Sequence, residues 1–84
     1  MSRGKKARLR SIDWNAVGER LRELRGFHMT QAEFAKRIGV SQGYYSLAER
    51  GQREIGPEIL LRISHEVGKS IEWLLTGKSS TAKE

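Results

Sequence analysis

The segment at residues 30–51, TQAEFAKRIGVSQGYYSLAERG, places the strongest constraint on the fold, because two short helical patterns meet in it at a glycine. Thr30 and Glu33 fit a capping box, in which the hydroxyl and the carboxylate each bind a free backbone N–H at a helix start. Gly39 ends the first helix, because glycine adopts the left-handed conformation of a helix C-terminus without a steric penalty. Helices of about two turns are unstable in isolation. The segment therefore predicts two helices that pack on each other and on a larger helical core.

Ser41 is a suitable N-cap for the second helix, which we expect to cover residues 42–50 and to stop at Gly51. Two short helices joined by such a turn form a helix-turn-helix, and the second helix of this motif enters the major groove of DNA. The capping residues and glycines therefore indicate a DNA-binding function.

The same segment resembles the lambda/434 repressor and Cro family of XRE-type regulators. The family pattern has Thr or Ser followed by Gln, then an Ala, then Gly-hydrophobic-Ser/Thr, and finally Glu-x-Gly. The residues at matching places are Thr30, Gln31, Ala35, Gly39, Val40, Ser41, Gln42, Glu49 and Gly51. The resemblance extends over residues 14–77. It implies an all-α, compact five-helix lambda-repressor-like domain whose second and third helices form the helix-turn-helix.

Apolar residues outside this segment predict three more helices, near residues 13–26, 57–68 and 71–77. They recur at helical spacing, so each helix has one buried face. These residues are Trp14, Val17, Leu21 and Leu24, then Ile59, Leu60, Ile63 and Val67, and finally Ile71, Trp73, Leu74 and Leu75. Before Thr30, we expect Phe27 or Met29 to fill the core. Leu61 is an apolar residue beyond those needed for the buried face of its helix. With an edge of Ile71 or Leu75, it suits a two-fold dimer contact.

Positive charge is concentrated at the start of the 84-residue chain. The net charge is +6, of which residues 1–12 carry +5, whereas residues 13–77 hold nine basic and nine acidic groups. We expect a disordered basic arm at residues 1–12, a single DNA-binding domain at residues 13–77, and a frayed tail at residues 78–84. Arg8 and Arg10 of the arm are candidate DNA-backbone contacts that act by counterion release, the alternative being a solvated tail without function.

The sequence offers no support for an enzyme, a metal site or a membrane protein. It contains no cysteine, no second histidine at ligand spacing, no nucleophile-base-acid set and no phosphate-binding glycine loop. It also has no long apolar run and no secretory signal. We therefore expect no cofactor and no small-molecule ligand, and a cytoplasmic, nucleoid-associated protein.

The second helix of the motif carries the candidate base contacts. Gln42 can bind adenine N6 and N7 together, which discriminates against a wrong base by about 1–3 kcal/mol. Tyr44 can reach a phosphate or lie against a thymine methyl, and Ser46 can bind a base edge or a phosphate. The sequence leaves two alternatives for Leu47, because it either meets a thymine methyl or is buried in place of Ala48.

Phosphate contacts are expected at the helix starts and in the loop after the second helix. Gln31 lies in a first turn, where free N–H groups and the helix dipole favour a phosphate, and the resemblance implies that it also touches Gln42. Basic residues after this helix position a protein on DNA without reading sequence, with surface solubility as the alternative interpretation. The expected backbone contacts of the domain are Thr30, Gln31, Ser41, Gly43, Arg50, Gln52 and Arg53. We interpret Arg20 and Arg37 as solvated charges, with Arg37 a secondary phosphate candidate.

The resemblance further implies a structural ion pair between Arg25 and Glu49. We expect the chain to bind double-stranded DNA and to pair with a second copy of itself. The homodimer would bind a palindromic operator with half-sites one helical turn apart. The alternative is a protein-interaction module of the same fold, antitoxin-like or partner-binding, with DNA binding incidental. The neutral charge of residues 13–77 favours this alternative, whereas Gln31, Gln42, Arg50 and Arg53 on one face oppose it.

Overall fold

The computed structural model describes residues 11–78, in which all but short connecting segments are helical. In order along the chain these are α2 (Trp14–Arg25), α3 (Gln31–Ile38), α4 (Gln42–Glu49), α5 (Pro57–Val67) and α6 (Ile71–Thr76). All regular secondary structure in this range is helical, which confirms the all-α prediction. The predictions for Arg8, Arg10 and the tail beyond Lys78 concern residues outside it.

The helix starts follow the capping residues of the sequence. Thr30 and Glu33 form the complete capping box, with the Glu33 N–H 3.0 Å from Thr30 Oγ1 and the Thr30 N–H 2.9 Å from Glu33 Oε1. Ser41 and Ser70 cap α4 and α6 through their hydroxyls, and Pro57 stands in the first turn of α5. Gly39 adopts the left-handed conformation with φ 77° and ψ 33°. The boundaries of the helix-turn-helix are therefore set by local chemistry that the sequence shows directly.

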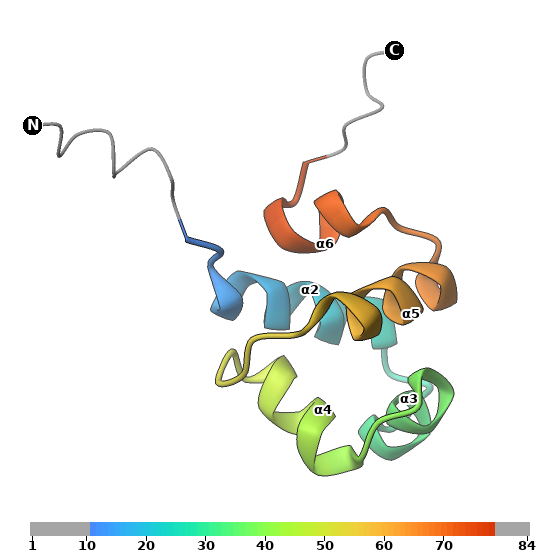
Figure 1. Cartoon of the computed structure of the whole chain (residues 1–84). Helices are drawn as coiled ribbons and strands as arrows, with labels where there is room; N and C mark the ends of the chain where they lie inside the picture. Colours follow the sequence, from blue (N-terminus) through green and yellow to red (C-terminus); the bar gives the residue numbers. More distant parts are fainter. Residues whose placement is uncertain (1–10, 79–84) are drawn as a thin grey trace, which may run out of the picture.

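The arrangement of the helices separates α3 and α4 from α6. Figure 1 shows α2 and α5 between these two parts, with α6 on the side away from α3 and α4. α4 packs against both α2 and α3, and α6 packs against α2 and α5. α4 thus lies at one edge of the bundle, with its inner face on the core.

α2 and α4 approach so closely that backbone meets backbone. Gly18 of α2 is buried, and a Cβ atom added there would overlap the carbonyl oxygen of Glu49 at the end of α4. Gly51 has φ 75°, and a Cβ atom there would overlap the side chain of Asn15. The sequence pattern predicted Gly51 as a helix stop, but nothing in it indicated a need for glycine at position 18.

The core contains most of the predicted apolar residues. At its centre the rings of Phe34 and Tyr45 lie 5.0 Å apart between centroids, at an angle of 51°. Ile55, between α4 and α5, is also buried, although no periodicity marked it. Of the two alternatives for the link before Thr30, the structure has Met29 packed against the core and Phe27 fully exposed. The other members of the core are Val17, Leu21, Ala35, Ile38, Ala48, Leu60, Ile63 and Leu74.

Three arginines that look like surface charges in the sequence join separate helices. Arg20 of α2 donates from Nη1 to the carbonyl oxygen of Leu74 in α6, at 3.0 Å. Arg62 of α5 donates to the carbonyl oxygen of Ile38 at the end of α3, at 3.2 Å. Arg37 pairs with Glu66 of α5 at 3.0 Å, while its side chain stays 56% exposed, as expected of a solvated charge. These contacts connect α2 to α6 and α3 to α5.

Candidate nucleic-acid interface

α4 presents a polar face outward and an apolar face to the core. Gln42 and Gly43 are exposed, and Tyr44, Ser46 and Leu47 are half-buried. Tyr45 and Ala48 are 0% and 2% exposed. Of the two alternatives for Leu47, the structure has the one in which Ala48 is buried and Leu47 stays partly at the surface. The residues proposed to read bases therefore share the outer face of one short helix at the edge of the fold.

Glu49 is the buried charged residue beneath this face, with 4% of its surface exposed. Arg25 of α2 binds it through two contacts, Nε to Oε2 at 2.6 Å and Nη2 to Oε1 at 3.0 Å. Arg25 Nη1 also donates to the carbonyl oxygen of Met29, at 2.9 Å. The two residues therefore form the ion pair that the resemblance implied, and it ties the ends of α2 and α4 to the link before α3.

Gln31 completes this buried network. Its Nε2 donates to Glu49 Oε1 at 2.9 Å, a partner that the resemblance did not imply. Burial raises the pKa of the Glu49 carboxyl, but hydrogen bonds from Arg25 and Gln31 outweigh this effect and leave the pKa below its ordinary value. Glu49 is therefore an anion at neutral pH, and it holds the first residue of α3 in a fixed orientation.

The loop after α4 carries a side chain that contacts that helix. The predicted phosphate contacts Arg50, Gln52 and Arg53 are exposed in this loop. The guanidinium carbon of Arg53 lies 4.7 Å from the centre of the Tyr44 ring. No sequence pattern indicated this contact, because it depends on the path of the loop after Gly51.

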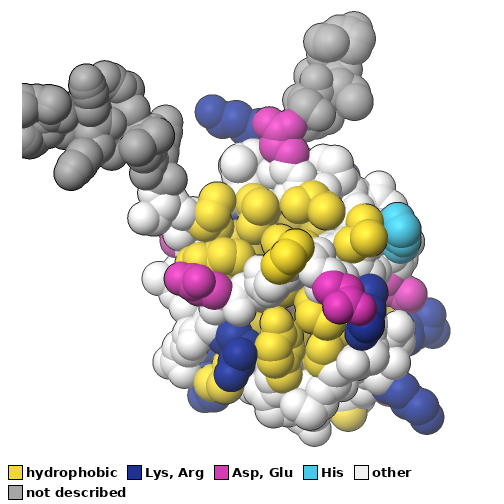
Figure 2. All heavy atoms as spheres, in the orientation of Figure 1, with side chains coloured by type: hydrophobic (Ala, Val, Ile, Leu, Met, Phe, Trp, Pro, Cys, Tyr) yellow, Lys and Arg dark blue, Asp and Glu magenta, His cyan; other side chains and the backbone are white. Residues whose placement is uncertain are grey.

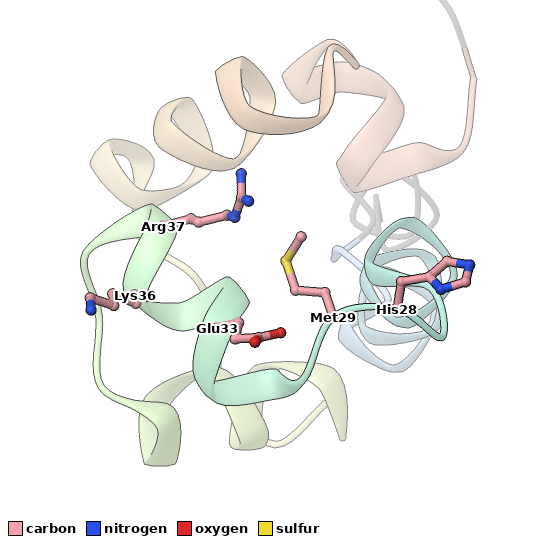
Figure 3. A pocket seen from close by; sticks show the side chains of 5 residues that line it. All are labelled: His28, Met29, Glu33, Lys36 and Arg37. Atoms are coloured by element: carbon pink, nitrogen blue, oxygen red, sulfur yellow. The ribbon is translucent and has the colours of Figure 1, made fainter.

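A surface hollow of about 600 Å³ lies beside α3, but its side chains do not converge. Figure 3 shows Met29 and Arg37 pointing into the space, whereas His28 and Lys36 point away from it. Glu33 is engaged in the capping box, and Arg37 in its ion pair with Glu66. Across residues 11–78, no group of three or more His, Asp or Glu side chains is placed to hold a metal ion. The α4 face with its flanking loops is therefore the better candidate for a functional site.

Comparison with known proteins identifies the family to which this arrangement of helices belongs. The helix-turn-helix family matches residues 20–74, most of the described range. The chain belongs to the helix-turn-helix family. The match spans α3 and α4 and the ion pair between Arg25 and Glu49. No curated protein sequence gives a significant match.

Solved helix-turn-helix structures share the fold over most of the chain. The restriction-modification controller protein C.AhdI from Aeromonas hydrophila is 30% identical, with a TM-score of 0.66 over 74% of this chain and 91% of that one. The P22 c2 repressor protein, solved in complex with a synthetic operator, is 36% identical, with a TM-score of 0.69 over 74% and 96%. The clp gene regulator ClgR from Corynebacterium glutamicum is 35% identical, with a TM-score of 0.67 over 77% and 70%.

These similarities fix the general class of the protein. It is a lambda-repressor-like, sequence-specific DNA-binding transcriptional regulator and not an enzyme. No helix between residues 11 and 78 has the length and apolar character needed to cross a membrane.

Proposed function

We propose that this helix-turn-helix regulator binds a palindromic DNA operator as a homodimer, with α4 of each protomer in a major groove. The observation that carries this proposal is the two-sided character of α4. Its inner residues Tyr45 and Ala48 are buried in the core, and its outer residues Gln42 and Gly43 are exposed. The P22 c2 repressor, which shares the fold, was solved with operator DNA.

The proposed base contacts are made by α4. The exposed amide of Gln42 has the donor and acceptor that complement adenine in the major groove. Ser46 and Leu47, both half-buried in the next turn of the helix, are the proposed contacts to a base edge and a thymine methyl. Tyr44 lies in the first turn of the same helix. Sequence preference would therefore depend on four side chains within eight helical residues.

The proposed phosphate contacts surround these residues. The N-termini of α3 and α4, at Thr30, Gln31, Ser41 and Gly43, offer backbone N–H groups and the positive ends of two helix dipoles. On the other side of α4 the exposed Arg50, Gln52 and Arg53 supply donors from the following loop. Such contacts on both sides of a recognition helix fix its register in the groove. Arg8 and Arg10 would add nonspecific affinity through counterion release.

The homodimer is supported by apolar surface on the part of the molecule away from α4. Leu61 of α5 is 47% exposed. Figure 2 shows hydrophobic side chains gathered on the face where Figure 1 places α5 and α6. Other partly buried hydrophobic residues of these helices are Ile59, Val67, Ile71 and Leu75. A two-fold contact here would leave both α4 helices free to enter successive major grooves, about 34–36 Å apart.

Selection of bound sequences from a random pool of duplex DNA at physiological salt tests this proposal. We expect a palindrome with two half-sites one helical turn apart. Gln42→Ala should then relax the preference at one base position in each half-site, whereas Arg53→Ala should weaken all sequences alike. Failure to enrich any sequence, or equal losses on all sequences from both changes, would overturn the assignment.

A further inference from the structure

Tyr44 and Arg53 form a cation–π contact with each other. Neither a base contact by Tyr44 nor a phosphate contact by Arg53 would require it. Arg53 lies in the loop after α4, yet its guanidinium carbon is 4.7 Å from the ring centre of Tyr44 in the first turn of that helix. Tyr44 is held at its base, because its backbone N–H donates to Ser41 Oγ at 3.0 Å and its side chain is half-buried. An anchored aromatic ring therefore lies against an arginine that would otherwise extend from an exposed loop.

The physical effect of this contact is to reduce the freedom of Arg53. A long arginine side chain loses rotamer entropy when it is fixed on a phosphate, and this loss weakens binding. A ring that already holds the cation reduces the loss. The attraction arises from the ring quadrupole, so it leaves the guanidinium N–H groups available for phosphate oxygens. Tyr44 is thus suited to orient Arg53 before DNA arrives.

We infer that Tyr44 is a positioning residue for Arg53, and that the two side chains act on the DNA backbone as one unit. This inference rests on the proposed function, and it changes the role of Tyr44 from reading a base to presenting a cation. Its particular consequence concerns the salt dependence of DNA binding. Removing the uncharged ring of Tyr44 lowers the number of counterions released on binding, because Arg53 then makes its phosphate contact less often.

A double-mutant cycle on the full chain, with the selected operator as ligand, tests the inference. The variants are Tyr44→Leu, Arg53→Ala and the two combined, and each is titrated between 50 and 200 mM salt. Tyr44→Leu should weaken binding about two- to five-fold per protomer, the range that an exposed cation–π contact supports. It should also reduce the slope of log affinity against log salt, by up to about 0.9 per protomer. In the Arg53→Ala background the same change should have little further effect.

Two comparisons isolate the effect of the aromatic ring on Arg53. Tyr44→Phe is the conservative variant and keeps the aromatic face, so it should restore the salt slope that Tyr44→Leu loses. Arg50, exposed at the end of α4, provides a matched background: in Arg50→Ala, Tyr44→Leu should cost as much as it does in the wild-type chain. Thermal unfolding of each variant without DNA checks that the fold is intact, and a merely structural role for Tyr44 would shift this transition while leaving the salt slope unchanged.

The measurements distinguish failure of the inference from failure of the proposed function. Independent losses in the cycle, an unchanged salt slope in Tyr44→Leu, or an equal loss in Tyr44→Phe would overturn the inference while wild-type binding remains. If the wild-type chain binds no duplex DNA at all, the proposed function fails and the inference fails with it.

Discussion

The side chain of Gln31 donates a hydrogen bond to the carboxylate of Glu49, across 2.9 Å from Nε2 to Oε1. This bond joins the first residue of α3 to the last residue of α4. The same carboxylate also accepts hydrogen bonds from Arg25 at the end of α2. The two helices that carry the candidate interface, α3 and α4, therefore meet α2 at one buried anion, so their relative positions depend on its pairing.

Loss of the arginine partner should destabilise the fold strongly. We expect Arg25→Ala to lower the free energy of unfolding by about 3–5 kcal/mol, because it leaves the Glu49 carboxylate buried without its partner charge. Urea denaturation at neutral pH measures this difference. Arg22→Ala, at an exposed position of the same helix, is the control and should change the free energy by less than about 0.5 kcal/mol. Similar losses in both variants would contradict this role for the ion pair.

The Glu49 carboxyl should also make stability depend on acidity. Its pKa is lower in the folded chain than the ordinary glutamate value, so its contribution is complete above about pH 4.3 and is lost as the pH falls through the folded-state pKa. The free energy of unfolding of the wild-type chain should therefore drop on acidification. In Glu49→Gln the drop should be shallower, whatever the stability of that variant at neutral pH. Urea unfolding curves collected between about pH 7 and pH 3 compare the two slopes, and equal slopes would refute the prediction.

Substitution of alanine for glycine should change the stability of the fold in opposite directions at two helical positions. Gly18→Ala should destabilise the chain by about 1–3 kcal/mol, because the new methyl group meets the carbonyl oxygen of Glu49. Gly43→Ala in α4 should stabilise it by about 0.5–1 kcal/mol, since the nearest atom is 4.0 Å away and alanine favours a helix. Chemical denaturation of both variants provides the measurement. A neutral or stabilising Gly18→Ala would show that α2 and α4 can separate without cost.

A charge on α5 should disrupt the proposed dimer but not the fold. Leu61 is nearly half exposed in the single chain, so Leu61→Lys should leave the unfolding free energy of the monomer almost unchanged. It should shift the chain toward monomer in sedimentation equilibrium and weaken binding to a two-site operator more than to a half-site. Glu23→Ala, an exposed change on α2 and outside α5 and α6, is the control. A dimer of wild-type strength in Leu61→Lys would exclude this face as the interface.

The helices were predictable because their signals are local. Thr30 with Glu33, and Ser41 and Ser70, act on backbone groups within three residues, so their roles can be identified in the sequence. Helical spacing likewise identified the core residues of α2 and α5. The choice between Phe27 and Met29 as core residue was left open, because residues 26–29 lie outside any helix and carry no periodicity; the structure selects Met29.

Contacts between distant segments were not predictable from the same signals. Gly18 carries no side chain, so the close approach of α2 and α4 leaves no pattern in hydrophobicity. Arg20 and Arg62 reach backbone carbonyls of other helices, and a long flexible side chain gives no indication of its partner before the fold is known. For the same reason the hydrogen bond from Gln31 to Glu49 was not predicted.

The close backbone contact between Gly18 and Glu49 has a consequence for redesign. Main-chain contact and buried side chains determine the position of α4, whereas Gln42 and Gly43 are exposed. A library that randomises those two positions should keep a folded scaffold in most of its members. The chain could then be retargeted to new binding sites by exchanging a few surface residues on an unchanged framework.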